Sequence, residues 1–401
     1  MIESLRKTYN EAFTLEKYNA FLQSIYAAFH HQPVFRIAET PVFIPDDFRD
    51  KLFQACDDIV DVIAAPNFKS LTDRAIRPEH FVPNEDGHPT FIVIDFGVCA
   101  NDKGELIPQM IEMQGFPSLY AFQDLLSESY KRHFDTIPKD MIPYFNGLNR
   151  QTYFDLLREV IVGNTQSEKV VLLEVEPEKQ ATLIDFLATA KEVGIKICCL
   201  TKVIKRGKRL YYKNENGKSV RIEKIYNRVI FDELDRRKDL KLTFKFTDDL
   251  EVEWIGHPNW FFRISKYTLP FIESEFVPKT LFLKDIKTYP TDLENYVLKP
   301  LFSFSGQGVK INVTQADLDA VEDKSNFILQ RKVQYVPALH APNEPAKIEI
   351  RMMMVWKKGD PRPQLVNNLI RLSKGEMIGV RYNKDKDWVG ASVGLFSDTR
   401  S

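Results

Sequence analysis

The stretch Val297-Leu298-Lys299-Pro300-Leu301-Phe302-Ser303-Phe304-Ser305-Gly306-Gln307-Gly308-Val309 combines a strand that ends in a lysine with a loop of small residues. Such a loop can wrap backbone N–H groups around phosphates, and the lysine adds one fixed positive charge. The same pattern also occurs in ordinary hairpin loops, where glycine pairs are common. The stretch therefore predicts a phosphate site if other segments supply the remaining parts of that site.

A second group of polar residues lies in two predicted neighbouring strands, TFIVIDFGV (90–98) and ELIPQMIEM (105–113). Alternate positions of a strand share a face, so Glu112 and Gln114 can converge, and Asp95 can join them from the adjacent strand. Oxygen ligands of this kind suit Mg²⁺. A solvated strand face would also explain Glu112 and Gln114, but Asp95 lies in an apolar run where an unpaired charge is costly.

The order of predicted elements indicates a mixed α/β (α+β) chain. Apolar residues recur at helical spacing over 4–29, 48–63, 118–134 and 150–162. The segments VVLLEV (170–175), a helix over 177–193 and IKICCL (195–200) form a β-α-β unit. A hairpin and a strand follow, over 210–223 and 224–231. The last third is predicted to be strand-rich, with one short helix over 315–323 and strands at 296–301, 308–313, 326–333, 347–356 and 363–372.

Composition excludes several classes of function. The 401 residues predict two or three structural units. The 55 Lys and Arg residues nearly balance the 56 Asp and Glu residues, so the chain has no excess of positive charge that would attract nucleic acid or an anionic membrane. No apolar stretch approaches the ~18 residues that a membrane span needs. The four cysteines form no C-x-x-C pair, and a cytoplasmic location is expected.

Four segments together resemble the ATP-grasp superfamily. They are Ser265-Lys266, expected to open a helix, with Val277-Pro278-Lys279-Thr280, expected to enter a strand; the 297–309 stretch; Gln330-Arg331-Lys332-Val333; and Glu349-x-Arg351. The resemblance implies that Lys266 and Lys299 bind the ATP phosphates with the 303–308 loop, namely Ser303, Ser305, Gly306, Gln307 and Gly308. It further implies that the hinge strand binds adenine, through Gln330, Lys332 and Val333, and that Asp95, Glu112 and Gln114 form the metal triad, which would hold two Mg²⁺ ions.

The order of these motifs is similar to that of circularly permuted ATP-grasp proteins such as glutathionylspermidine synthetase. Most members place the metal triad after the lysines, whereas here it precedes them by about 200 residues. Permutation is tolerated when the original termini lie close together at the surface. The expected units are an N-terminal helical and metal-binding part (1–165), a Rossmann-like pre-ATP-grasp domain (166–255), a lid with the lysines (256–329) and the remaining catalytic strands (330–401).

The sequence departs from the family pattern at three places. Gln114 replaces the usual asparagine, Val93 stands where relatives often carry a phosphate-binding arginine, and no acid closely follows the hinge. Arg351 and Arg371 are expected to contact the γ-phosphate or an acyl phosphate, although solvent-facing strand arginines are the alternative. Arg228, in the strand Ile225-Tyr226-Asn227-Arg228, is the candidate for a substrate carboxylate, and its alternative is an ion pair with Asp232 or Glu233.

The resemblance implies an ATP-dependent carboxylate–amine ligase that forms an amide through an acyl phosphate. Its expected partners are a small carboxylic acid and an amine, of the amino acid, peptide or polyamine type, together with ATP and Mg²⁺. Two alternatives stay open. One is a phosphotransferase on the same fold, since a fold does not fix the acceptor. The other is a degenerate nucleotide-binding module without ligase activity.

Overall fold

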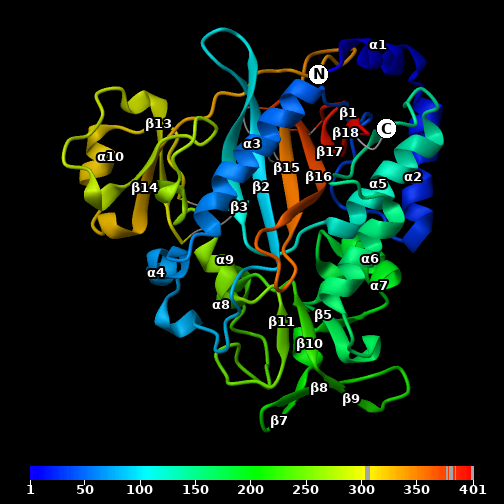
Figure 1. Cartoon of the computed structure of the whole chain (residues 1–401), viewed down its shortest axis with the longest axis vertical. Helices are drawn as coiled ribbons and strands as arrows, with labels where there is room; N and C mark the ends of the chain where they lie inside the picture. The colour runs from blue at the N-terminus through cyan, green and yellow to red at the C-terminus, as the bar shows by residue number, and fades with distance from the viewer. Residues whose placement is uncertain (303–307, 376–377, 379–382, 384, 399–401) are drawn as a thin grey trace.

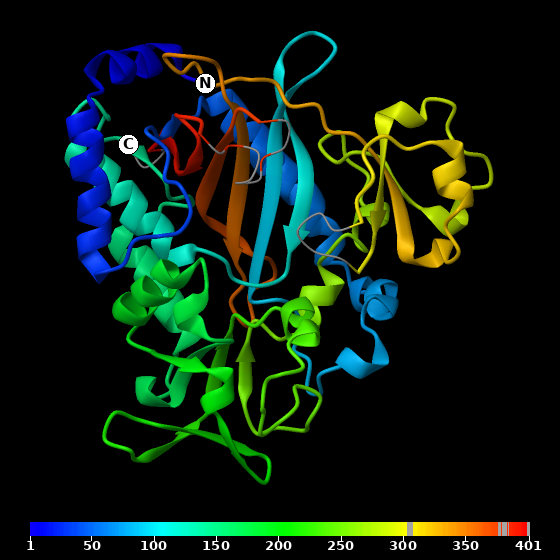
Figure 2. The same cartoon turned by 180° about the vertical axis from the view of Figure 1, so that it is seen from behind.

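The computed structural model describes residues 1–302, 308–375, 378, 383 and 385–398, and it has a mixed α/β fold with several separate sheets (Figure 1, Figure 2). The largest sheet is antiparallel, with the strand order β17-β16-β15-β2-β3. Its strands are β2 (Phe91–Ala100), β3 (Leu106–Gln114), β15 (Lys347–Val355), β16 (Gln364–Ser373) and β17 (Gly390–Ser392). β2 pairs with β15 on one side and with β3 on the other, so the sheet joins distant parts of the chain.

The two faces of this sheet differ in chemistry. One face carries Ile92, Ile94, Phe96 and Val98 of β2 into the main hydrophobic core, which includes helix α3 (Asp46–Ile63). On the opposite face Phe91 and Val93 pack into a second core together with helices α5 (Tyr120–His133) and α6 (Arg150–Ile161). Because successive side chains of a strand alternate in direction, Asp95 shares the second face with Val93. On this second face, the polar surroundings of Asp95 therefore lie next to the apolar part that α5 and α6 cover.

A four-stranded parallel sheet lies at one end of the molecule (Figure 1). Its order is β11-β10-β5-β6, with β5 (Val170–Glu174), β6 (Lys196–Cys199), β10 (Lys224–Asn227) and β11 (Glu253–Ile255). The predicted β-α-β unit is confirmed, and its helix α7 (Leu183–Val193) starts later than expected because Pro177–Lys179 form a 3₁₀ turn. The predicted strand 224–231 ends early, at Asn227, and helix α8 (Phe231–Arg236) follows.

A three-stranded antiparallel sheet lies beside α3 and β3, on the opposite side of the molecule from α5 (Figure 1). It consists of β12 (Thr280–Phe282), β14 (Phe327–Arg331) and β13 (Tyr296–Pro300), with helix α10 (Gln315–Asp319) in its small core. The strand predicted over 308–313 was wrong, since that segment has one isolated bridge, Lys310 to Leu298. The expected boundary at 329/330 falls inside β14.

The remaining elements connect and cover these sheets. The predicted helical segment 4–29 is two helices, because Thr14 accepts a hydrogen bond from the backbone N–H of Lys17 and starts the second. No helix in the described part of the chain is both long and apolar enough to cross a membrane. The other elements are α1 (Glu3–Ala12), α2 (Leu15–Phe29), β1 (Val42–Phe43), α4 (Phe68–Thr72), β4 (Met141–Ile142), β7 (Ile204–Arg206), β8 (Arg209–Lys213), β9 (Ser219–Ile222), α9 (Asn259–Arg263) and β18 (Gly394–Ser397).

Candidate functional site

Asp95 lies at the centre of a cluster of charged residues on the large sheet. The register of β2 and β15 sets Asp95 opposite Arg351, and Arg351 donates from Nε and Nη2 to the two carboxylate oxygens at 2.6 and 2.7 Å. Arg371 on β16 donates to the same carboxylate, and it also pairs with Glu349, its partner across β15 and β16. Asp95 is 1% exposed, so two guanidinium groups compensate its buried charge. The alternative of solvent-facing strand arginines therefore does not hold for Arg351.

A β-bulge in β3 places Glu112 beside this cluster. Asp95 pairs with Glu112, whereas Phe96 pairs with Met110, so Ile111 is an extra residue in β3. The bulge lets both Met110 and Met113 reach the main core, although they are three positions apart. Glu112 consequently shares a face with Asp95, and its carboxylate lies 3.8 Å from Arg351 and 3.9 Å from Arg371. Its side chain is 46% exposed, in contrast to Asp95.

Gln114 follows on the same face of β3, opposite Val93 of β2. Val93 is 1% exposed and belongs to the second core. A charged side chain at position 93 would have to enter that core, which explains why the arginines of this cluster come from neighbouring strands instead.

The cluster shifts the pKa values of its carboxyl groups in opposite directions. Burial alone would raise the pKa of Asp95, but Arg351 and Arg371 hold it below its usual range. Partial desolvation and the negative charge of Asp95 raise the pKa of Glu112. Burial likewise raises the pKa of Glu349, against the opposing effect of Arg371. Glu112 is the most exposed of these three carboxyl groups. It is therefore the one whose ionised form an added cation would stabilise most.

Tyr335 links the cluster to the segment that follows β14. Its hydroxyl donates to Glu349 Oε2 at 2.8 Å, and its ring lies against Gly97. A Cβ at Gly97 would lie 2.6 Å from Tyr335 Cε1, so only glycine leaves room for this ring. The backbone N–H of Val336 donates to Val98 at 3.0 Å and fixes the segment to β2. Sequence reasoning missed Tyr335, and no local signal marks it.

Lys299 approaches the cluster from the three-stranded sheet. Its Nζ donates to Gln330 Oε1 at 2.6 Å, because Lys299 on β13 and Gln330 on β14 lie on adjacent paired strands. Burial lowers the pKa of Lys299, while the negative charge of Glu112 opposes that change. The lysine and Glu112 are therefore within electrostatic range of each other, although far apart in the sequence.

The other residues expected at the nucleotide lie around this sheet. Lys332 donates its backbone N–H to Asn295 at 2.8 Å, and Val333 follows beyond the end of β14. Gly308 has a φ of +70°, and a Cβ there would lie 2.8 Å from Pro300 Cγ, so the close approach of residue 308 to β13 requires glycine. Four residues expected in the phosphate loop, Ser303, Ser305, Gly306 and Gln307, lie outside the described residues.

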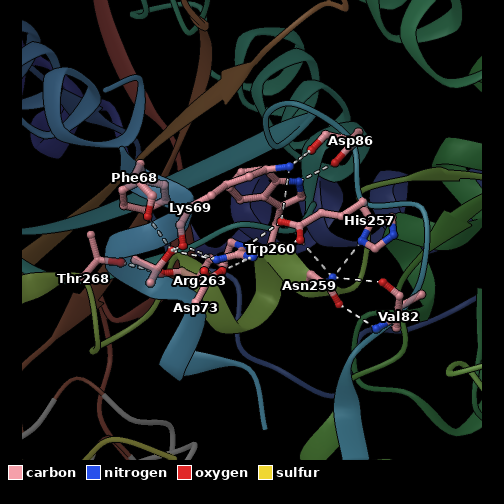
Figure 3. Close-up of polar contacts among 12 residues, drawn as sticks. Phe68, Lys69, Asp73, Val82, Asp86, His257, Asn259, Trp260, Arg263 and Thr268 are labelled. Atoms are coloured by element: carbon pink, nitrogen blue, oxygen red, sulfur yellow. Dashed lines mark hydrogen bonds and ion pairs between the residues drawn. The ribbon is translucent and has the colours of Figure 1, made fainter. Parts of the chain in front are cut away.

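Lys266 lies in a turn between α9 and the 3₁₀ turn Leu269–Phe271, so the expectation that Ser265 and Lys266 open a helix was wrong. The preceding helix is held by a buried polar network (Figure 3). Arg263 donates from Nε and Nη2 to Glu85 at 2.6 and 3.0 Å, and Asn259 exchanges two hydrogen bonds with the backbone of Val82 at 3.0 Å each. This network fixes the backbone immediately before Lys266.

Arg228 does not belong to the Asp95 cluster. It follows β10 at the carboxyl end of the parallel sheet and is 4% exposed, and its Cζ lies 5.6 and 5.5 Å from the ring centroids of Phe116 and Phe186. It forms no ion pair with Glu233 in the described part of the structure, where its Nε and Nη1 have no hydrogen-bond partner.

The expected metal triad fits Mg²⁺ only in part. Both oxygens of Asp95 accept hydrogen bonds from arginine, which leaves little capacity for a cation. Glu112 and Gln114 retain oxygen atoms on a half-exposed strand end. No three His, Cys, Asp or Glu residues among those described form a group that could hold a metal by themselves. Mg²⁺ often takes one or two protein ligands and completes its shell with phosphate and water, so Glu112 and Gln114 suffice for such a site.

Comparisons with known proteins bear on the fold. No family model and no curated protein matches the sequence. This chain is similar to a glutathione synthetase-like effector from Globodera pallida in its apo form, with a TM-score of 0.54 and 10% identity, over 90% of this chain and 94% of that chain. At this identity the likeness concerns the fold, and the mixed α/β architecture is shared over nearly the full length of both chains.

Proposed function

We propose that this chain is an ATP-dependent carboxylate–amine ligase with a circularly permuted ATP-grasp fold. The observation that carries the proposal is the approach of Lys299 to Glu112. Lys299 lies near the end of β13, and the glycine loop follows that strand. The lysine is within electrostatic range of Glu112 on the large sheet, as a nucleotide site between the two sheets requires. The fold of a glutathione synthetase-like protein supports it, because glutathione synthetase is itself an ATP-grasp enzyme.

In this proposal the basic residues bind the phosphates of ATP. Lys299 and Lys266 neutralise them from the side of the three-stranded sheet. Arg371, with 37% of its side chain exposed, is the arginine best placed to reach the transferred phosphoryl group. Arg351 is held on Asp95 and helps to orient Arg371 through their shared carboxylate. A guanidinium can hold two oxygens of a phosphoryl group and stabilise the charge that develops during transfer.

Glu112 and Gln114 would hold Mg²⁺. A bound magnesium ion supplies charge neutralisation on the phosphate oxygens. The raised pKa of Glu112 fits this role, because a nearby cation would restore the ionised carboxylate.

The reaction proceeds in two steps. An oxygen of the substrate carboxylate attacks the γ-phosphorus, the bond from that phosphorus to the ADP oxygen breaks, and an acyl phosphate forms. The amine nitrogen then attacks the acyl carbon, the C–O bond to phosphate breaks, and the nitrogen loses a proton to leave an amide. Loop closure over the site would protect the acyl phosphate from water.

The nucleotide product tests this function. Purified protein is incubated with ATP, Mg²⁺ and pools of candidate acids and amines, and the nucleotides are separated by chromatography. ADP and phosphate that form only when acid and amine are both present support the ligase. AMP with pyrophosphate indicates adenylation, a stable phosphorylated product without an amine indicates a phosphotransferase, and binding without turnover indicates a degenerate module.

A further inference from the structure

Arg6, in helix α1, is a buried arginine with one unused hydrogen-bonding edge. The residue is 4% exposed. Its Nη1 donates to the hydroxyl of Thr40 and, at 3.1 Å, to the backbone carbonyl of Pro41. Its Nε and Nη2 are buried, and neither has a hydrogen-bond partner among the described residues. These two atoms form the edge of the guanidinium that can hold both oxygens of one carboxylate.

Two other buried arginines of this protein use the same edge for a carboxylate. Arg351 donates from Nε and Nη2 to Asp95 at 2.6 and 2.7 Å. Arg263 donates from the same two atoms to Glu85 at 2.6 and 3.0 Å. A buried charged group that lacks its hydrogen bonds is costly, so the unused edge of Arg6 suggests that a ligand supplies two oxygen atoms.

The positive charge of Arg6 has no acidic counter-ion within the described part of the chain. Burial lowers the pKa of Arg6 to about 10, and the groups that oppose this change are tyrosines, which are neutral at pH 7. Glu39, next to Thr40 in the sequence, is engaged elsewhere, because it pairs with Arg36 and accepts the backbone N–H of Trp388 at 2.8 Å. A buried cation without a counter-ion favours a bound anion.

Aromatic rings from three segments surround this guanidinium. The Cζ of Arg6 lies 4.6, 5.7 and 5.9 Å from the ring centroids of Tyr9, Phe43 and Trp388. Tyr9 belongs to α1, Phe43 to β1, and Trp388 lies just before β17, so distant parts of the chain meet at Arg6 (Figure 1). Aromatic rings offset part of the cost of a buried cation, but they do not replace acceptors for N–H groups.

We propose that Arg6 binds the carboxylate of a small monocarboxylic acid between α1, residues 36–44 and Trp388. Nε and Nη2 each donate to one carboxylate oxygen, while Thr40 holds the guanidinium through Nη1. One negative charge neutralises the single positive charge of the site, whereas a dianion such as hydrogen phosphate would leave an excess negative charge among the rings. The aromatic surroundings favour an acid with an apolar body.

This site is separate from the Asp95 cluster. The two are connected through β17, because Ala38 donates its backbone N–H to Ala391 at 2.8 Å, and Ala391 pairs with Arg371 across β16 and β17. A bound acid would fill the contact between α1 and the other two segments, so it should also slow the opening of α1. Binding at Arg6 does not depend on ATP or on the proposed function.

Thermal unfolding with added salts tests the binding without ATP or Mg²⁺. Sodium acetate, propionate and benzoate are titrated into the full chain and compared with sodium chloride and sodium phosphate at equal ionic strength. At least one carboxylate should raise Tm in a saturable way and slow amide hydrogen exchange in α1. If no carboxylate raises Tm above the chloride control, or if phosphate acts equally, the proposal is overturned.

Variants then locate the site. Arg6→Lys keeps the positive charge but loses the edge with two N–H groups, so the affinity for the active acid should fall at least tenfold by calorimetry. Thr40→Val should also weaken binding, whereas Thr40→Ser keeps the hydroxyl and should bind as wild type does; this pair keeps a test available if Arg6→Lys fails to fold. Lys7→Gln, an exposed neighbour that pairs with Glu11, should leave the affinity unchanged. Equal affinity of Arg6→Lys, Thr40→Val and wild type would overturn the site.

Discussion

Arg351 and Asp95, which are 256 positions apart in the sequence, form a two-point ion pair across β15 and β2 at 2.6 and 2.7 Å. The pair is buried and joins the strand that carries the expected metal ligand to the strand that carries the expected phosphate ligand. It therefore couples the stability of the large sheet to the geometry of the candidate site.

Arg351→Met should destabilise the protein by about 3–5 kcal/mol, because it leaves the carboxylate of Asp95 buried with only one of its two arginines. The double variant Arg351→Met with Asp95→Asn should recover much of this loss, since the uncompensated charge is gone. Urea unfolding of both single variants and the double variant measures the coupling. Additive losses would show that the two residues contribute independently.

Glu112→Gln should weaken Mn²⁺ binding, followed by electron paramagnetic resonance, at least tenfold. Asp95→Asn should change it by less than about threefold, because the oxygens of Asp95 are already used by arginines. Glu349→Gln is the control, as this third acid of the cluster is 4% exposed and pairs with Arg371. A loss in Asp95→Asn as large as that in Glu112→Gln would make Asp95 a metal ligand.

Lys299→Ala should weaken ATP binding about tenfold to a hundredfold, which corresponds to the ~1.5–3 kcal/mol of a hydrogen bond to a charged group. The fold should stay intact, because the ammonium group of Lys299 is held by a single side chain, that of Gln330, among the described hydrogen bonds. Lys310→Ala is the matched control, since that lysine is exposed and pairs with Asp317. ATP-induced shifts of Tm give the comparison, and equal shifts in wild type and Lys299→Ala would remove Lys299 from the site.

Gly97→Ala should displace Tyr335, because the added Cβ would lie 2.6 Å from its ring. We expect a loss of about 1–3 kcal/mol in the free energy of unfolding and weaker ATP binding, since the displaced segment follows β14. Gly87→Ala, where a Cβ meets nothing within 4 Å, should behave as wild type. A wild-type stability of Gly97→Ala would mean that the segment adapts without cost.

Asp86 should make stability depend on pH. Burial raises the pKa of Asp86 to about 6, even though Trp260 donates a hydrogen bond to it (Figure 3). Since the unfolded pKa is about 4, the protonated form favours folding, and this contribution is lost as the pH rises through about 6. Between pH about 4 and about 7, wild type should lose about 2 kcal/mol relative to Asp86→Asn, which keeps an acceptor for Trp260. Asp102→Asn, in an exposed turn, should follow wild type.

Local pattern predicted the parts of the fold that depend on near neighbours. The turn after β2 makes β2 and β3 antiparallel partners, so the proximity of Asp95 and Glu112 followed from the sequence. The bulge at Ile111 could not be predicted in this way. It forms because burial of both Met110 and Met113 in one core requires an extra residue between them. A strand over 308–313 was expected from alternating apolar residues, but that segment forms only one bridge to β13.

Long-range register decided the remainder of the site. Glu349 and Arg351 share a face of β15 because they are two positions apart, but their partners Arg371 and Asp95 depend on how three strands align. Tyr335 enters the cluster only because Gly97 leaves room for its ring. Neither relationship is visible in a single sequence, since each joins residues whose separation exceeds any local periodicity.

The position of β2 has a consequence for biosynthesis. Its partner β15 leaves the ribosome about 250 residues later, which at ~5–20 residues per second means a delay of roughly 12–50 s. During that time the nascent chain holds the apolar strand FIVIDFGV with one unpaired edge and an uncompensated aspartate. Before Arg351 emerges, the unpaired carboxylate of Asp95 makes premature burial of this strand costly, so the residue that joins the ion pair in the finished sheet opposes aggregation of the incomplete chain.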